Sequence, residues 1–283
     1  MKIAFAGSNG MLGNAFQILL KNSIKHNSIF KDRTSLDITN KHAVNNFFEK
    51  NQFDVFINCA AYTNPDQAES EPEIVNLVNG EAVGYLAKKC KEKNILFITF
   101  STDYVFDGSQ KEGYLEFDKT NPINNIGLSK VIGEKLTQEG NSNYYIIRVQ
   151  WTYGPHGNNF VKTITTLFNE GKKLKIIDNE FGSPTYTLDI ANKTLELIEN
   201  NDNYMPGIYH MTNSGITNWH NFAEYLLSKY TGEEIKLDTQ KSEEMVRIAK
   251  RPHFSKLIST KFEALRSWEE AIEDFLTDKE FKI

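Results

Sequence analysis

A glycine-rich turn near the start of the chain constrains its fold more than any other feature. The apolar residues 3–6 predict a buried strand, and the turn that contains Gly7, Gly10 and Gly13 follows it directly. The residues that then recur at helical spacing are Leu12, Ala15, Phe16, Leu19 and Leu20. In this order of strand, turn and helix, free N–H groups at the helix start bind a pyrophosphate, and the helix dipole favours its charge. The spacing G-x-x-G-x-x-G also occurs where a turn only packs a strand on a helix, so the flanking elements carry the prediction of a dinucleotide site.

Strands and helices alternate over the first half of the chain. The predicted strands are residues 28–30, 54–59, 95–100 and 144–149, and the predicted helices are residues 42–49, 73–93 and a helix that begins at 125. This α/β pattern predicts a Rossmann-type doubly wound parallel sheet, which we assign to a dinucleotide-binding domain over residues 1–154. The loop over residues 107–124 is expected at the surface because it carries glycines, acids and Pro122.

Beyond Gly154 the alternation loosens. The predicted helices there are residues 159–170, 188–200, 219–230 and 268–276, and the predicted strands are residues 174–178 and 207–211. No linker separates this part from the first. We therefore predict that residues 155–283 form a smaller, mixed α/β substrate-binding lobe that interleaves with the sheet and closes a cleft.

Composition excludes several classes of protein. The net charge is −5 without a basic cluster, which argues against nucleic acid as a partner. No stretch has transmembrane length, and a strand that begins at about residue 2 leaves no room for a signal peptide, so no membrane is expected and the predicted location is cytoplasmic. Cys59 and Cys90 lie in apolar surroundings without metal-ligand spacing, so we predict structural thiols and no metal.

Small and polar residues follow two of the predicted strands at their carboxyl ends, where open α/β sheets bind ligands. The residues that follow strand 54–59 are Ala60, Ala61, Tyr62 and Thr63, and those that follow strand 95–100 include Thr102, Asp103 and Tyr104. Polar residues directly after a buried strand need partners in the protein or in a ligand. Thr102 could equally cap a turn, and Tyr104 could pack with its hydroxyl satisfied by the protein.

An acidic residue lies where a dinucleotide fold meets the adenosine part of its cofactor. Asp37 follows the second strand, and the alternative is that it only starts a turn or caps the next helix. Lys31 and Arg33 could accept a 2′-phosphate, which would favour NADPH, or they could be solvated surface charges.

Motifs along nearly the whole chain resemble one known family. They are residues 7–13, 36–39, 58–63 and 101–108, Ser129-Lys130, Gly133-Glu134, Arg148, Trp151, Tyr153-Gly154, residues 182–185, and Arg251-Pro252. In this order they resemble the extended short-chain dehydrogenase/reductase superfamily and, within it, the dTDP-4-dehydrorhamnose reductase family. The stretch Ser-Thr-Asp-Tyr-Val-Phe-Asp-Gly over residues 101–108 is the most specific of them. The resemblance implies transfer of a hydride from NADPH or NADH to the C4 ketone of a deoxysugar nucleotide, and it allows a homodimer.

The resemblance also implies roles for individual residues. The expected cofactor-binding residues are Gly7, Asn9, Gly10, Met11, Leu12, Asp37, Ile38, Ala60, Ala61, Thr63 and Lys130. The residues expected to hold the sugar nucleotide are Thr102, Asp103, Tyr104, Trp151 and Arg251. Trp151 alone is equally typical of a core position, and Arg251 could pair with a local acid instead of a phosphate.

One position departs from the family pattern. The family's catalytic motif is Tyr-x-x-x-Lys, and here Lys130 is preceded by Ile126 at the tyrosine position. Ketone reduction creates an alkoxide that an acid must protonate, and isoleucine has no proton to give. One hypothesis is a working reductase with Thr102, Lys130 and Tyr104 as catalytic residues, the proton coming from Tyr104, Tyr62 or a water on Thr102. The other is a binding protein that kept the dinucleotide site and lost the chemistry, similar to the regulatory β subunit of methionine adenosyltransferase.

Overall fold

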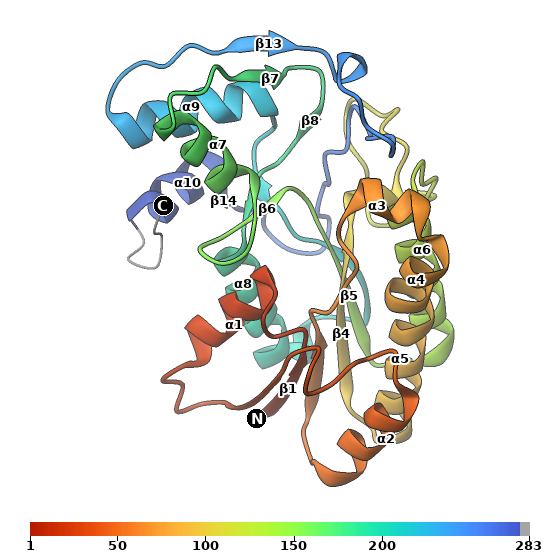
Figure 1. Cartoon of the computed structure of the whole chain (residues 1–283). Helices are drawn as coiled ribbons and strands as arrows, with labels where there is room; N and C mark the ends of the chain where they lie inside the picture. Colours follow the sequence, from red (N-terminus) through yellow and green to blue (C-terminus); the bar gives the residue numbers. More distant parts are fainter. Residues whose placement is uncertain (278–283) are drawn as a thin grey trace.

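The computed structural model describes residues 1–277. Within them, six parallel strands form one sheet in the order β10-β5-β4-β3-β1-β2, so the predicted Rossmann-type fold class is confirmed (Figure 1). These strands are β1 Lys2–Ala6, β2 Asn27–Lys31, β3 Val55–Asn58, β4 Leu96–Thr102, β5 Tyr144–Val149 and β10 Gly207–His210. All five strands predicted before residue 154 are present. Most of their apolar residues are buried because helices cover both faces of the sheet, whereas Ile29 and Phe30 of the edge strand β2 are only partly buried.

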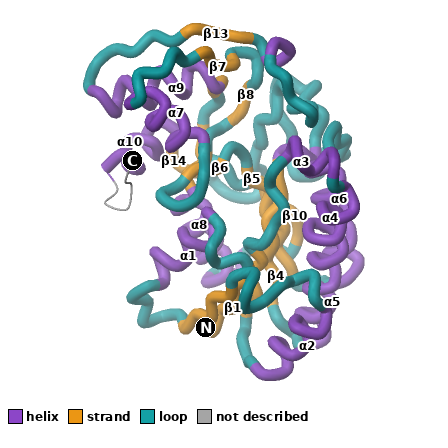
Figure 2. The backbone as a smooth tube through the Cα atoms, viewed as in Figure 1, coloured by secondary structure: helices purple, strands orange, loops and turns teal. Residues whose placement is uncertain are grey.

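Helices lie on both faces of this sheet (Figures 1 and 2). On one face, α1 Met11–Leu20 packs beside α8 Thr187–Glu199. Phe16 and Leu197 from these two helices join Phe5 of β1 in a single apolar cluster. The other face carries α2 Lys41–Lys50, α5 Ala82–Glu92 and α6 Asn125–Gly140. The carboxyl ends of the parallel strands are thereby left as the place where a ligand can enter.

The predicted helix over residues 73–93 is present as a continuous helical segment, but it contains a π-helical turn that was not predicted. It begins as α4 Pro72–Asn76, widens into the π-helical turn η1 Leu77–Glu81 and continues as α5. Within η1 the Asn79 amide accepts the N–H of Tyr62 and donates to the Tyr62 carbonyl and to Ser129 Oγ. These contacts turn the Asn79 side chain toward the loop after β3, where a short helix, α3 Pro65–Ser70, was not predicted.

The chain returns to the sheet after residue 154, because α8 and β10 both belong to its layers. The remaining helices are α7 Phe160–Asn169, α9 Trp219–Thr231 and α10 Trp268–Thr277, and with α8 they confirm the helices predicted there. The short strands are β6 Thr152–Tyr153, β7 Lys175–Ile177, β8 Phe181–Gly182, β9 Thr185–Tyr186, β11 Asn213–Ser214, β12 Thr217–Asn218, β13 Asp238–Gln240 and β14 Leu265–Ser267. A separate apolar cluster joins α7, α9 and α10. The division of function at residue 154 stays a prediction.

The loop over residues 107–124 is not wholly at the surface, contrary to expectation. Tyr114 is buried, its ring stacks on Phe106 at 4.1 Å between centroids, and its hydroxyl donates to Asp107. The backbone N–H of Tyr114 donates to the Lys256 carbonyl, so the loop is tied to a distant part of the chain. A pattern of glycines and acids predicts chain reversal but does not exclude an aromatic anchor.

Candidate active site

The glycine turn has the geometry that a close-packed helix start needs. Gly7 has φ +73°, and a Cβ on it would lie 2.4 Å from the Ala60 nitrogen. A Cβ on Gly13 would lie 2.4 Å from the Gly7 oxygen, so these two glycines bring the strand, turn and helix together. At Gly10 the nearest atom to such a Cβ is the Gly7 oxygen at 3.3 Å, and among the described residues no side chain caps the helix there. Gly10 therefore leaves space at the positive end of α1, where a pyrophosphate fits.

A pocket of about 480 Å³ opens beside this turn. Its lining includes the predicted cofactor residues Gly7, Asn9, Gly10, Asp37, Ile38, Ala60 and Ala61. It also includes Arg33 and Tyr62, but four other predicted cofactor residues, Met11, Leu12, Thr63 and Lys130, are not among its described lining residues. The structure thus brings most of the predicted cofactor residues to one cavity from three different strand ends.

Asp37 lies in this pocket and also shapes the turn that holds it. Its Oδ1 accepts the N–H of Thr39 at 2.9 Å and the Thr39 hydroxyl at 2.7 Å. Partial burial favours the neutral carboxyl, but the Thr39 hydrogen bonds and the charge of Arg33 outweigh it and lower the pKa of Asp37. Asp37 therefore presents a charged carboxylate, and Arg33 beside it lines the same cavity as a cation.

Lys130 is buried beneath the end of β4. Its Nζ donates to the Phe100 carbonyl oxygen at 2.8 Å. Burial lowers the pKa of Lys130 to about 8, against the opposing charge of Glu134 one helical turn away. The ammonium is held rigidly on the sheet, close to the strand end that delivers Thr102.

Thr102 and Asp103 belong to a hydrogen-bond network within the protein. Thr102 Oγ1 accepts the N–H of Tyr104 at 3.2 Å, which caps the short 3₁₀ turn, and it donates to Asp103 Oδ1 at 2.9 Å. The buried Asp103 carboxylate also accepts from Gln150 Nε2 at 3.0 Å, and Gln150 in turn donates to Ser255. Burial raises the pKa of Asp103, although these hydrogen bonds oppose the rise. Gln150 and Ser255 were not predicted from the sequence, because they lie far apart along the chain and no motif connects them.

Position 126 lies in an apolar cluster beside two tyrosines. Ile126 is 5% exposed and packs with Ala68 and Val75, with Tyr62 and Tyr104 at the margin. The next residue, Gly127, allows this approach, because a Cβ there would lie 2.0 Å from the Tyr104 carbonyl oxygen. The isoleucine side chain thus lies where α6 meets the turn after β4.

The two tyrosines beside Ile126 differ in their hydrogen bonding. Tyr62 donates its hydroxyl proton to Glu71 Oε2 at 2.7 Å, and burial together with this bond raises its pKa to about 12. Within residues 1–277 the Tyr104 hydroxyl makes no hydrogen bond, and burial raises its pKa well above the usual range. Tyr104 therefore carries a phenol that stays protonated and is free to donate.

Arg251 pairs with a local acid. Its Nη2 lies 3.2 Å from Asp66 Oδ2 on α3, and its Nη1 donates to the Ala249 carbonyl at 2.7 Å. The guanidinium carbon lies 6.0 Å from the ring centroid of Tyr104. The predicted alternative of an acid partner is therefore present, and it places Arg251 beside Tyr104.

Trp151 stacks on a tryptophan that sequence reasoning did not select. The ring centroids of Trp151 and Trp219 lie 3.7 Å apart with an interplanar angle of 13°. Trp151 has φ +43°, a conformation that residues with side chains rarely adopt. The signal that the sequence offered for Trp219 was its place as an aromatic residue at the start of a predicted helix.

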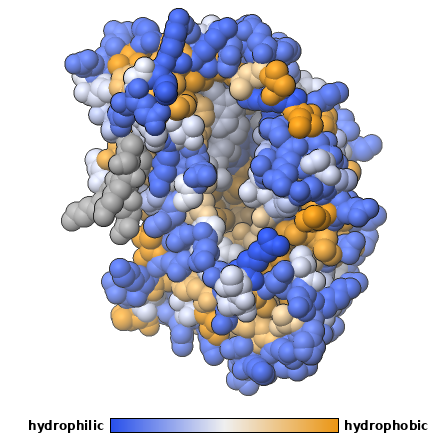
Figure 3. Space-filling model, in the orientation of Figure 1, coloured by the Kyte–Doolittle hydropathy of each residue, from blue (hydrophilic) through white to orange (hydrophobic). Residues whose placement is uncertain are grey.

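The face drawn in Figure 3 is hollowed between the part that carries α7 and α9 and the part that carries α3 and the sheet.

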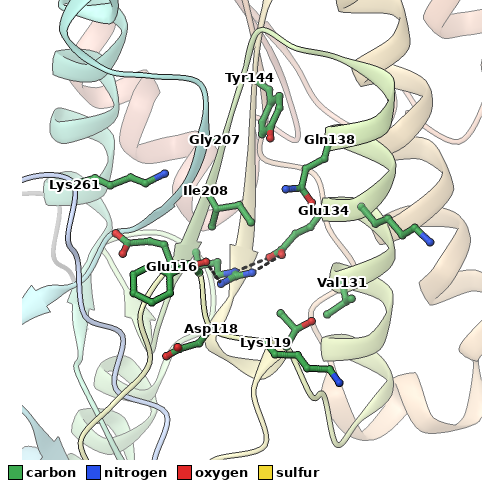
Figure 4. A pocket seen from close by; sticks show the side chains of 14 residues that line it. Glu116, Asp118, Lys119, Val131, Glu134, Gln138, Tyr144, Gly207, Ile208 and Lys261 are labelled. Atoms are coloured by element: carbon green, nitrogen blue, oxygen red, sulfur yellow. Dashed lines mark hydrogen bonds and ion pairs between the residues drawn. The ribbon is translucent and has the colours of Figure 1, made fainter.

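A second cavity, of about 610 Å³, lies on the other side of α6 (Figure 4). Glu134 points into it from α6, opposite Ile208 of β10. The Glu134 carboxylate is paired with Arg148 of β5 through two hydrogen bonds of 2.9 and 2.7 Å, and Ser101 donates to the same carboxylate. The buried pair ties α6, which carries Lys130, to β5, and the Ser101 hydrogen bond ties the same helix to the end of β4 that carries Thr102.

In residues 1–277, no three His, Cys, Asp or Glu side chains are grouped so that they could hold a metal ion. Within the same range, every helix is too short or too polar to cross a membrane.

The family model described as RmlD substrate binding domain matches residues 1–281 of this chain. The chain belongs to the RmlD substrate binding domain family. Among curated relatives, the spore coat polysaccharide biosynthesis protein SpsK of Bacillus subtilis is 32% identical over 282 residues, which cover 98% of each chain. The dTDP-4-dehydrorhamnose reductase of Burkholderia thailandensis is 34% identical over 236 residues, which cover 81% of this chain and 78% of that protein.

Solved structures of RmlD-family proteins have the same fold over the whole chain. A dTDP-4-dehydrorhamnose reductase from Clostridium acetobutylicum is 37% identical, with a TM-score of 0.92 and coverage of 98% of both chains. The dTDP-4-dehydrorhamnose reductase from Bacillus anthracis, solved in complex with NADP, is 34% identical with a TM-score of 0.92, covering 97% of this chain and 98% of that one. The resemblance stated from the sequence motifs is thereby confirmed.

Proposed function

We propose that this protein is an NADPH-dependent reductase of a dTDP-4-keto-6-deoxy sugar in the synthesis of a polysaccharide precursor. The observation that carries the proposal is the pocket beside Gly10, because its glycine turn leaves room for a pyrophosphate and its rim carries Asp37 and Arg33. The names of the relatives support the substrate, and the NADP complex of a relative supports the cofactor. A homodimer and a cytoplasmic location stay predictions.

The residues have the following proposed roles. The pyrophosphate is held by Gly7, Asn9, Gly10, Met11 and Leu12. The adenosine is contacted by Asp37 and Ile38. The middle of the cofactor is lined by Ala60, Ala61 and Thr63, and the nicotinamide ribose is hydrogen-bonded by Lys130. Arg33 donates hydrogen bonds to the 2′-phosphate and so favours NADPH over NADH, because a guanidinium can donate two parallel hydrogen bonds to a phosphate. The sugar nucleotide is held by Thr102, Asp103, Tyr104, Trp151 and Arg251. When bound, the cofactor supplies the hydride that reduces the ketone.

The proton for the alkoxide comes from Tyr104 in this proposal. Three groups are candidates: Tyr104, Tyr62 and a water on Thr102. The Tyr62 hydroxyl already donates to Glu71, and the Thr102 hydroxyl already donates to Asp103. The Tyr104 hydroxyl has no such bond among the described residues, so it can donate to a substrate oxygen without first breaking a contact.

The test is NADPH oxidation with a dTDP-4-keto-6-deoxy sugar. Native turnover should fall by roughly 100-fold or more in Tyr104→Phe, since a positioned acid contributes about 10²–10⁴-fold. Tyr62→Phe is the matched control and should change turnover by less than about threefold. Loss in Tyr62→Phe but not in Tyr104→Phe would transfer the role to Tyr62.

A binding protein without turnover is the second candidate, and the buried Ile126 is the observation that favours it. In that case the native protein binds the sugar nucleotide and NADPH but leaves NADPH unoxidised. Ile126→Tyr, which places a hydroxyl one helical turn from Lys130, should then create at least about tenfold more turnover, equal to about 1.4 kcal/mol of barrier. Brisk native turnover that does not rise in Ile126→Tyr excludes this candidate.

A further inference from the structure

Three aromatic rings from different elements cluster at the edge of the proposed sugar site, where Trp151 and Trp219 stack face to face and Phe160 packs on Trp219 at an angle of 42°. Trp151 follows β5, Trp219 is the first residue of α9, and Phe160 is the first residue of α7. The centroids of Trp151 and Trp219 are 3.7 Å apart, and those of Trp219 and Phe160 are 4.4 Å apart. Trp151 and Trp219 are both only partly buried, so the pair lies at a surface that a ligand can reach.

The position of Trp219 is fixed by its own element. Asn218, directly before it, caps α9 by accepting the N–H of Asn221 at 2.7 Å. Asn218 also belongs to β12, which pairs with β8 at Phe181. The ring of Trp219 is therefore held from the second lobe, independently of the strand that leads to Trp151.

The backbone of Trp151 is held in a conformation that it would otherwise leave. Its φ is +43°, and its carbonyl accepts the N–H of Thr185 at 3.2 Å. Gly182 lies against the other side of this turn, where a Cβ would be 2.8 Å from Trp151 Cε2 and 2.7 Å from Gln150 Nε2. A strained backbone that several contacts over-determine is typical of a residue that presents its side chain to a ligand.

From this arrangement we infer that Trp219 is a positioning residue that fixes the indole of Trp151 against the ring of the bound sugar. The inference rests on the proposed function, in which Trp151 contacts the sugar. A 6-deoxy sugar carries a methyl group in place of a hydroxymethyl group, and this more apolar edge packs on an indole without leaving a hydroxyl unbonded. A ring that is already held in place loses little freedom when the sugar binds.

The test compares two probes, dTDP-rhamnose and dTDP, by isothermal titration in the NADPH-loaded protein. Trp219→Leu should weaken dTDP-rhamnose binding about five- to tenfold and leave dTDP binding unchanged, because only the sugar meets the stack. Trp219→Phe keeps an aromatic ring and should recover most of the lost affinity. Trp268→Phe is the matched control, since Trp268 is the remaining tryptophan and its ring packs on Phe222 and Tyr225, with no described ring contact to Trp151 or Trp219.

Circular dichroism adds a readout that does not depend on binding. Two stacked indoles give an exciton couplet, which should be present in the native protein and in Trp268→Phe and lost in Trp219→Leu. Loss of the couplet with unchanged dTDP-rhamnose affinity would overturn the inference and leave the stack as packing alone. Equal weakening of both probes, or a lowered melting temperature that Trp219→Phe does not restore, would also overturn it.

The outcomes separate this inference from the proposed reductase activity. Binding of dTDP-rhamnose that weakens in Trp219→Leu, without NADPH oxidation in the native protein, supports the inference and contradicts the reductase proposal. If the native protein oxidises NADPH and Trp219→Leu has the same KM for the sugar substrate, the result supports the reductase proposal and contradicts the inference. A native protein that binds dTDP but gains no affinity from the rhamnose moiety contradicts the inference directly.

Discussion

The two ends of the proposed active site are built in different ways. At the nucleotide end the turn from Gly7 to Gly13 leaves space where side chains are missing, and the ligand would meet mostly backbone. At the sugar end the residues are side chains already bonded to one another, as Thr102 is to Asp103 and Arg251 is to Asp66. A backbone site fails when any side chain is added, whereas a side-chain network transmits the loss of one member to the others.

The two ends of the proposed active site also differ in which substitutions they tolerate. The proposed pyrophosphate site needs mainly the glycines and a strand–helix junction, whereas the side chains of Asp37 and Arg33 contribute at the rim of the pocket. The sugar end depends on Gln150, which links Asp103 to Ser255 across more than one hundred residues of sequence. A change such as isoleucine at position 126 therefore alters the sugar end while the nucleotide end keeps its geometry.

Removing the buried support behind the sugar end should have the largest effect. Arg148→Met leaves the Glu134 carboxylate buried with the Ser101 hydroxyl as its remaining described partner, and breaking such a pair costs about 3–5 kcal/mol of unfolding free energy. The measurement is urea unfolding followed by circular dichroism. The double variant Arg148→Met/Glu134→Met should recover part of the loss, because the Glu134 carboxylate is no longer buried without its guanidinium partner, although Lys130 loses the favourable charge of Glu134. If Arg148→Met is as stable as the native protein, the ion pair of Arg148 and Glu134 does not stabilise the fold.

The stability of the protein should depend on pH through Lys130, which lies between the two ends. Its folded pKa of about 8 is below the ordinary value of 10.5, so between these values the unfolded chain binds more protons than the folded chain. The free energy of unfolding should therefore rise with pH across this window, by at most about 3 kcal/mol from this residue. Lys130→Met should lack that part of the rise. Parallel pH profiles for the two proteins would contradict the assignment.

Cofactor binding at the nucleotide end can be disrupted without changing the sugar end, and the expected change in free energy is smaller. Gly10→Val places a branched side chain in the space proposed for the pyrophosphate and should weaken NADPH binding by at least about 100-fold, or about 2.7 kcal/mol. Isothermal titration measures it, and the melting temperature should stay near the native value. Gly232→Asn, at an open left-handed position after α9, is the control that should bind NADPH normally. Native affinity in Gly10→Val would exclude this turn as the cofactor site.

The sheet could be predicted because continuous apolar runs leave few alternatives to buried parallel strands. The glycine turn between β1 and α1 was predictable for a related reason, since its glycines are adjacent in sequence to the strand that they follow. The π-helical turn at Asn79 was not predictable, because it depends on contacts with Tyr62 and Ser129. Trp219 was missed because its partner lies 68 residues earlier in the chain (219 − 151), and no local pattern connects two such aromatic residues.

The return of the chain to its first sheet has a consequence for how the protein is made. Strand β10 covers the edge of β5, with Ile208 opposite Ile146, and α8 covers α1. While the ribosome adds the roughly 60 residues between Val149 and His210, the growing chain has an open strand edge and an uncovered apolar helix face. At roughly 5–20 residues per second this interval lasts several seconds, during which the chain can pair with another chain. The sheet is therefore begun by the first residues of the chain and is completed only when β10 has been made.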